Sequence, residues 1–187
     1  MRCNVSSYCR FVVFKTIAGM QWASENLPNN TFYSSGDDDF YLNFKKLLYT
    51  VNETLHFAES KNWKSYPIIC FHKTALNAKP HREKESKWFI DENEYKETTF
   101  PPYCLGGFYT TRADTVRRLY DAAKKVPYMR FDDVWITGTL RQLVNMTDDM
   151  LITPSRGIVV HKLGKTVSSS VLDHTWLMNY LCNCLVF

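Results

Sequence analysis

The pattern of apolar and polar residues in the first third of the chain predicts a helix, a short strand and a second helix. Residues 12–26 are expected to be helical up to Pro28, because proline cannot continue a helix. Residues 31–35 are predicted to form a strand that leads into Gly36 and three aspartates. The second helix follows from apolar residues at helical spacing that would share one buried face, namely Phe44, Leu47, Leu48, Val51 and Leu55.

Beyond residue 60, predicted strands alternate with irregular stretches. Apolar runs at 66–71, 88–90 and 158–160 are predicted strands, and the polar stretch 72–87 is expected to be irregular. The prolines and glycines of 100–107 exclude a helix there.

Two further helices are predicted between these strands. The first opens at a capping box, from Thr111 to Asp114, and would bury Val116, Leu119, Tyr120 and Ala123. The second spans 134–143, with Asp132 and Asp133 at its N-terminus. Because strands and helices are mixed along the chain, the sequence predicts the α/β class.

Length and composition change this picture little. The 187 residues predict one domain spanning 1–187, and 45% hydrophobic and 15% aromatic residues indicate a globular protein rather than a disordered one. The net charge of +4 is scattered along the chain, so the sequence does not favour nucleic-acid binding.

Cysteines and glycosylation signals favour the secretory pathway. The six cysteines form no CxxC pair, which argues against a zinc site, and their pairing is left open. Four N-x-S/T sequons occur, at Asn4, Asn29, Asn52 and Asn145. No signal peptide or membrane span is visible, so we expect the natural N-terminus, with any anchor, to be missing.

Two acidic groups are candidates for chemistry. Asp37, Asp38 and Asp39 follow a predicted strand, and three adjacent carboxylates favour a hard cation such as Mn²⁺ or Mg²⁺; the alternative is a solvated turn. Asp132 and Asp133 could supply a general base, and the alternative is a plain helix cap.

Histidine and aromatic residues complete the candidate site. His161 ends a predicted strand and could complete the metal shell; His174, expected in a C-terminal helix, is a second candidate, and both could be structural. Glycines that allow close approach and aromatic rings that stack on sugars are candidates for substrate binding, namely Trp88, Tyr103, Gly106, Gly107 and Tyr109. The alternative is a rigid loop with core aromatics.

These segments, taken in order, resemble the β-1,3-galactosyltransferase family, which includes β-1,3-N-acetylglucosaminyltransferases and is related to the fringe enzymes. The residues 32–43 are similar to the family's strand and DDD motif, and 86–109 resemble its KW…YPPYCSGxGY region. The residues 130–138 are similar to its EDVYVG motif. The resemblance covers roughly 12–161.

The resemblance implies a GT-A-type, Rossmann-like fold and an inverting transfer of galactose or N-acetylhexosamine from a UDP-sugar to a glycan hydroxyl. It also implies Mn²⁺ at Asp37, Asp38, Asp39 and His161, a catalytic base at Asp132 or Asp133, and a Golgi membrane location through an N-terminal anchor. Relative to the family, the first half of the nucleotide-binding fold has no counterpart here. Two alternatives therefore stay open: an inactive truncated relative, and a non-catalytic module that binds a divalent cation or carbohydrate.

Overall fold

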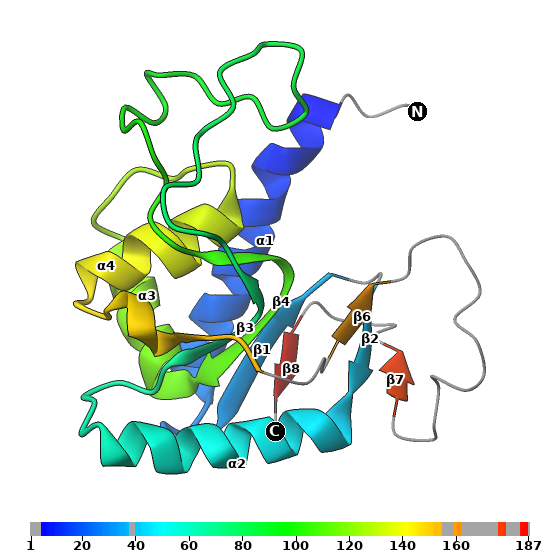
Figure 1. The fold of residues 1–187 in the computed structure, drawn as a ribbon, viewed down its shortest axis with the longest axis vertical. Helices are drawn as coiled ribbons and strands as arrows, with labels where there is room; N and C mark the ends of the chain where they lie inside the picture. The colour runs from blue at the N-terminus through cyan, green and yellow to red at the C-terminus, as the bar shows by residue number, and fades with distance from the viewer. Residues whose placement is uncertain (1–4, 38–39, 155–158, 162–175, 179–183, 187) are drawn as a thin grey trace.

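A computed structural model shows a mixed α/β arrangement, which confirms the predicted class (Figure 1). It describes residues 5–37, 40–154, 159–161, 176–178 and 184–186. The helical elements are α1 (Val5–Asn26), α2 (Phe44–Ser60), α3 (Ala113–Ala123), η1 (Val134–Leu140), α4 (Arg141–Leu143) and η2 (Asp148–Met150). The strands are β1 (Phe32–Gly36), β2 (Phe40–Asn43), β3 (Ile68–Lys73), β4 (Cys104–Arg112), β5 (Leu151–Ile152), β6 (Val159–His161), β7 (Trp176–Met178) and β8 (Cys184–Val186).

The strands form two sheets. The larger one has the order β5-β3-β4-β1-β8 and the smaller one the order β6-β2-β7. Only the β3–β5 pair is parallel among the pairs of described strands. Asp37, which directly follows β1, therefore lies where the chain leaves the large sheet for the small one.

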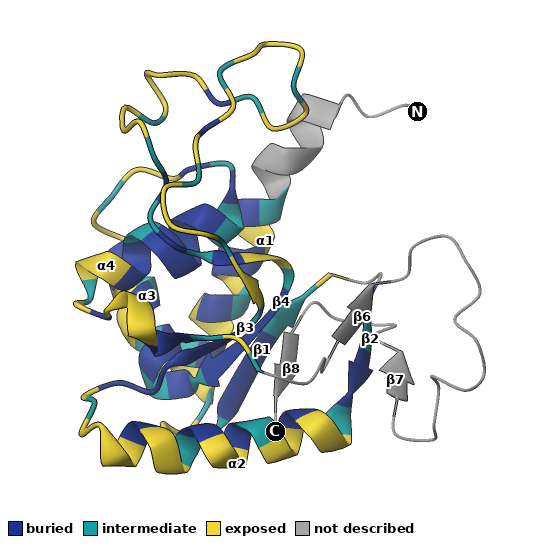
Figure 2. Cartoon of the chain, viewed as in Figure 1, coloured by how far each residue is buried: buried dark blue, intermediate teal, exposed yellow. Residues whose placement is uncertain are grey.

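Helices cover both faces of the larger sheet, because side chains alternate along each strand. Tyr33 and Ile68 belong to a core shared with α1, α3 and η1, whereas their neighbours Phe32 and Ile69 belong to a core shared with α2. Figure 2 shows the corresponding buried face of α2 against the sheet and its exposed outer face. The result is a three-layer α/β/α arrangement.

Local sequence explains where the helices form. In α2, Leu47, Val51, Thr54 and Ala58 are buried at helical spacing, and the Asn43 side chain caps the helix by accepting a hydrogen bond from the Lys46 N–H at 2.9 Å. The helix α1 ends before Pro28, as predicted, but begins at Val5 rather than near residue 12. Among the described residues, no helix combines the length and the apolar character that crossing a bilayer requires.

Two expectations about secondary structure are wrong. The segment 88–90 forms no strand but a single bridge between His81 and Phe89, and the Ile90 carbonyl accepts from the Arg82 guanidinium rather than from a neighbouring strand.

The other error concerns the start of a helix. Thr111 is not a helix cap: it lies in β4 and its hydroxyl donates to the Pro67 carbonyl at 2.9 Å. His174, expected in a C-terminal helix, lies outside the described residues, and the nearby residues Trp176–Met178 form β7.

The predicted helix at 134–143 is present but unusual. Its first part, η1, is a π-helix, and only Arg141–Leu143 continue as an α-helix. Almost all residues of η1 are buried, including Trp135 and Ile136. Such wide turns occur mostly as short insertions, often at functional sites.

Candidate active site

A cleft of about 750 Å³ opens between the ends of β1 and β3, the start of β4 and the start of η1. The segment 74–103, which joins β3 to β4, supplies much of its wall. Of the residues singled out from the sequence, five line this cleft: Asp37, Trp88, Tyr103, Gly106 and Asp133. The structure thus brings together the two acidic stretches that the sequence pattern predicts to share a site.

Asp37 is exposed and lies just after β1, where it enters the cleft. Its backbone N–H donates to the Gly107 carbonyl at 2.8 Å, so β4 fixes the position of the turn. Gly107 has a φ of +105°, and a Cβ there would lie only 2.1 Å from the Cζ of Phe40. A glycine is therefore required for the Phe40 ring to reach the cleft.

Asp133 is the partly buried carboxylate of the site. Its Oδ2 accepts from the Gly106 N–H at 3.2 Å and its Oδ1 from the Val134 N–H at 2.8 Å. Burial, followed by the charge of Asp132, raises the pKa of Asp133 to about 7; the hydrogen bonds from Val134 and Gly106 lower it in part, and the charge of Asp37 adds a smaller increase. A carboxylate with a pKa near neutrality can exchange a proton with a substrate hydroxyl.

Asp132 is placed differently, although it is the next residue along the chain. Its Oδ2 accepts a hydrogen bond from the Thr16 hydroxyl of α1 at 2.7 Å, and it is not among the residues that line the cleft. Burial raises its pKa, while the Thr16 bond lowers it. Of the two candidate bases, the geometry therefore favours Asp133, and Asp132 ties the start of η1 to α1.

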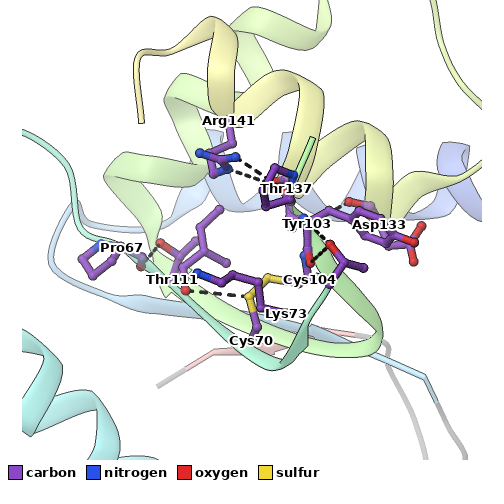
Figure 3. The surroundings of a disulfide bond; sticks show 12 residues. Pro67, Cys70, Lys73, Tyr103, Cys104, Thr111, Asp133, Thr137 and Arg141 are labelled. Atoms are coloured by element: carbon purple, nitrogen blue, oxygen red, sulfur yellow. Dashed lines mark hydrogen bonds between the residues drawn. A yellow bond between two sulfur atoms is a disulfide. The ribbon is translucent and has the colours of Figure 1, made fainter. Parts of the chain in front are cut away.

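Two polar residues of the η1 region, not singled out from the sequence, hold the site together (Figure 3). The Thr137 hydroxyl donates to the Asp133 carbonyl at 2.6 Å and accepts from the Cys104 N–H at 2.9 Å. Arg141 is fully buried, and its guanidinium donates to the carbonyls of Thr137 and Pro102 at 2.9 and 3.1 Å. An arginine that falls within a predicted, largely apolar helix was a signal that could have revealed this role.

A disulfide joins the strands on either side of the cleft wall. Cys70 of β3 and Cys104 of β4 are buried and bonded, with Cα atoms 5.1 Å apart (Figure 3). The sequence left this pairing open among six cysteines. Cys104 lies one residue from Tyr103 and two from Gly106, which both line the cleft, and its N–H also donates to Thr137. The disulfide therefore anchors the part of β4 that borders the cleft.

Aromatic side chains form part of the cleft surface. Trp88 is 48% exposed, and its ring centroid lies 6.0 Å from that of Phe131, which also lines the cleft. Burial, followed by the charge of Asp133, raises the pKa of Tyr103 to about 12, so its hydroxyl stays protonated as a donor. These rings offer apolar faces of the kind that stack on sugars.

Two predicted substrate-binding residues do not line the cleft. Tyr109 is buried in the core shared with α1 and α3, because it lies within β4 opposite Ser35 and Cys70. Gly107 contacts the Phe40 ring instead and orients the turn at Asp37. The structure thus places both residues in the framework beside the cleft, and their part in substrate binding stays a prediction.

The remaining predicted ligands fall at the edge of what the structure describes. Asp38 and Asp39 lie outside the described residues. His161 is described only by its backbone, which pairs with Phe40, the residue after the aspartate triplet. Within the described part of the chain, no three His, Cys, Asp or Glu side chains are grouped for a metal ion.

The sequence was also compared with known protein families and curated proteins. A family model described as Galactosyltransferase matches residues 5–150. The chain belongs to this galactosyltransferase family, whose members' GT-A-type fold agrees with the mixed α/β structure.

Several curated proteins are similar over the same region. The β-1,3-galactosyltransferase brn of Drosophila melanogaster is 33% identical over 122 residues, which cover 65% of this chain and 35% of the relative. Human β-1,3-galactosyltransferase 5 is 30% identical over 135 residues, 71% of this chain and 40% of the relative. Mouse β-1,3-galactosyltransferase 1 is 24% identical over 132 residues, which cover 71% of this chain and 38% of the relative. The chain thus spans well under half the length of these relatives.

Proposed function

We propose that this chain carries the catalytic half of an inverting hexosyltransferase, which moves galactose or N-acetylhexosamine from a UDP-sugar to a hydroxyl of a glycan acceptor. The observation that supports it best is that Asp37 and Asp133, from distant parts of the sequence, line one cleft that also exposes aromatic rings. The family match supports the same reaction class.

In this proposal Asp133 is the general base. Its ionised carboxylate takes the proton of the acceptor hydroxyl while that oxygen attacks the anomeric carbon of the donor sugar. The bond from the anomeric carbon to the diphosphate breaks on the opposite face, so UDP leaves and the configuration inverts. The N–H groups of Gly106 and Val134 hold the carboxylate in place throughout. General-base catalysis typically contributes 10²–10⁴-fold to such a rate.

A divalent cation, Mn²⁺ or Mg²⁺, fits the acidic end of the cleft. Asp37 presents a hard oxygen donor there. Its negative charge contributes to the raised pKa of Asp133, and a cation bound nearby would balance that charge. Asp37, Asp38, Asp39 and His161 would hold the ion. When bound, it supplies neutralising charge for the departing diphosphate.

The test combines donor, metal and base. We expect the protein to hydrolyse or transfer UDP-galactose, UDP-N-acetylglucosamine or UDP-N-acetylgalactosamine with Mn²⁺ and to stop when EDTA removes it. Asp133→Asn should lower turnover at least about 10²-fold. Asp132→Asn is the matched control and should change turnover much less.

Two results would contradict the proposal. If Asp133→Asn kept the normal rate, the base would be misassigned. If UDP did not bind in the presence of Mn²⁺, an inactive relative or a non-catalytic cation- or carbohydrate-binding module would be favoured instead.

For location we propose the lumenal side of the Golgi membrane. The buried Cys70–Cys104 disulfide and the four sequons support an oxidising secretory compartment. Co-localisation of the tagged full-length protein with a Golgi marker would test this, and cytosolic staining would contradict it.

A further inference from the structure

The charged residues that line the cleft are sorted by the element they come from. The acidic ones, Asp37 and Asp133, follow β1 and precede η1. The basic ones come from the end of β3 and the segment 74–103, namely Lys73, Lys79 and His81.

The segment 74–103 is not basic as a whole. The segment 74–103 also carries six carboxylates, at Glu83, Glu85, Asp91, Glu92, Glu94 and Glu97. None of these six lines the cleft. The ionisable side chains that this segment presents to the cavity are thus those of Lys79, His81 and Tyr103, and none of its carboxylates.

The lysines of this wall are available to a ligand. Lys79 is exposed and makes no ion pair or hydrogen bond with the described residues. Lys73 is also exposed; its Nζ donates to the Asp148 carbonyl at 3.2 Å, which leaves two of its three donors. A third ammonium group, that of Lys87, lies 4.8 Å from the ring centroid of Trp88.

We infer that this basic wall, defined by Lys73, Lys79 and His81, binds a carboxylate or sulfate group on the acceptor, so that the acceptor is an acidic glycan. The inference rests on the proposed transferase function and adds the chemical class of its acceptor. Trp88 lines the cleft beside the wall and would stack on the ring of the sugar whose anionic group the lysines contact.

The donor diphosphate is the other anion that could reach this cleft. In the proposed mechanism its charge is balanced by the cation near Asp37. The basic wall therefore has a separate task, and the experiment has to separate the two anions.

A binding assay without donor or metal tests the acceptor directly. Affinities for methyl β-glucuronide and methyl β-glucoside, which carry a carboxylate and a hydroxymethyl group at the same ring carbon, are measured by NMR titration of the purified protein. Methyl β-galactoside with and without a 6-sulfate forms a second pair. We expect the acidic member of at least one pair to bind at least about fivefold more tightly in low salt, with the preference shrinking in about 0.5 M NaCl because salt screens exposed charges.

Matched variants assign the effect to residues. Lys79→Ala and Lys73→Ala should each remove at least about half of the preference for the acidic sugar while leaving the neutral sugar unchanged. Lys84→Ala is the control, because Lys84 is exposed on the same segment but does not line the cleft.

Two outcomes would overturn the inference. One is equal binding of acidic and neutral sugars in both pairs. The other is a loss of UDP affinity, in a separate titration with Mn²⁺, on Lys79→Ala without any loss of acidic-sugar affinity. Since the sugar titrations need no turnover, their failure leaves the transferase proposal standing, and an inactive transferase leaves them interpretable.

Discussion

Replacing Asp133 by asparagine should make the protein more stable as it makes the enzyme less active. In the folded protein the pKa of this carboxyl rises from its ordinary value of 3.8 to about 7. Its charged form is therefore disfavoured by burial and by the neighbouring charges of Asp132 and Asp37. Asparagine keeps the shape and removes the charge, but its single acceptor oxygen can serve only one of the two N–H groups, Gly106 or Val134, that the carboxylate accepts from.

The size of the effect follows from linkage. At about 1.4 kcal/mol for each tenfold change in proton affinity, the rise to about 7 sets an upper limit of about 4 kcal/mol. Because the carboxylate faces a solvated cleft, we expect about 1–2 kcal/mol. The folded pKa is raised, so the gain should be near zero below about pH 4, grow between pH 4 and 7, and be complete above pH 7.

Urea unfolding of wild type and Asp133→Asn at pH 4 and pH 8, with EDTA present, measures this directly. EDTA is needed because a cation beside Asp37 would itself lower the pKa of Asp133. Asp91→Asn is a control of opposite sign, since hydrogen bonds from Asn93 lower the pKa of Asp91 and its variant should lose stability above pH 4. A difference between wild type and Asp133→Asn that is the same at both pH values would refute the reasoning.

Three other variants test the framework around the cleft. Gly107→Ala should destabilise by about 1–3 kcal/mol, because its Cβ would overlap the Phe40 ring, and the added change Phe40→Ala should recover part of that loss in a thermal-melt cycle. Arg141→Met should cost about 3 kcal/mol by leaving buried carbonyls without donors, measured by urea unfolding; a cost below 1 kcal/mol would show that water replaces the guanidinium. Replacing Cys70 and Cys104 together by serine opens a loop with a sequence separation of 34 and should cost about 3–4 kcal/mol, and an unchanged melting temperature under reducing agent would contradict this.

The helices and most strands could be predicted because their burial follows local periodicity. The buried face of α2 is a regular helical repeat, and β1 ends within a residue of its expected end. The predicted strand at 88–90 is not formed: the Arg82 side chain takes the Ile90 carbonyl, a contact that the periodicity of apolar residues does not reveal.

Within the site, the sequence predicted which residue types are present but not where their side chains point. Asp132 and Asp133 are equally acidic and adjacent, yet one accepts from Thr16 of α1 and the other from Gly106 of β4. Tyr109 has the composition of a sugar platform, but its place in β4 turns it into the core. Such choices depend on which elements pack on either side, which a single sequence does not encode locally.

The disulfide between β3 and β4 has a consequence for how this cleft can diversify. It closes the base of the segment 74–103, while the carboxylate of Asp133 is held by main-chain groups at the start of β4 rather than by that segment. Insertions or substitutions between the two cysteines can therefore reshape the wall that meets the acceptor without shifting the proton-accepting group. Swapping this one closed loop between relatives is a natural way to exchange their acceptor preferences.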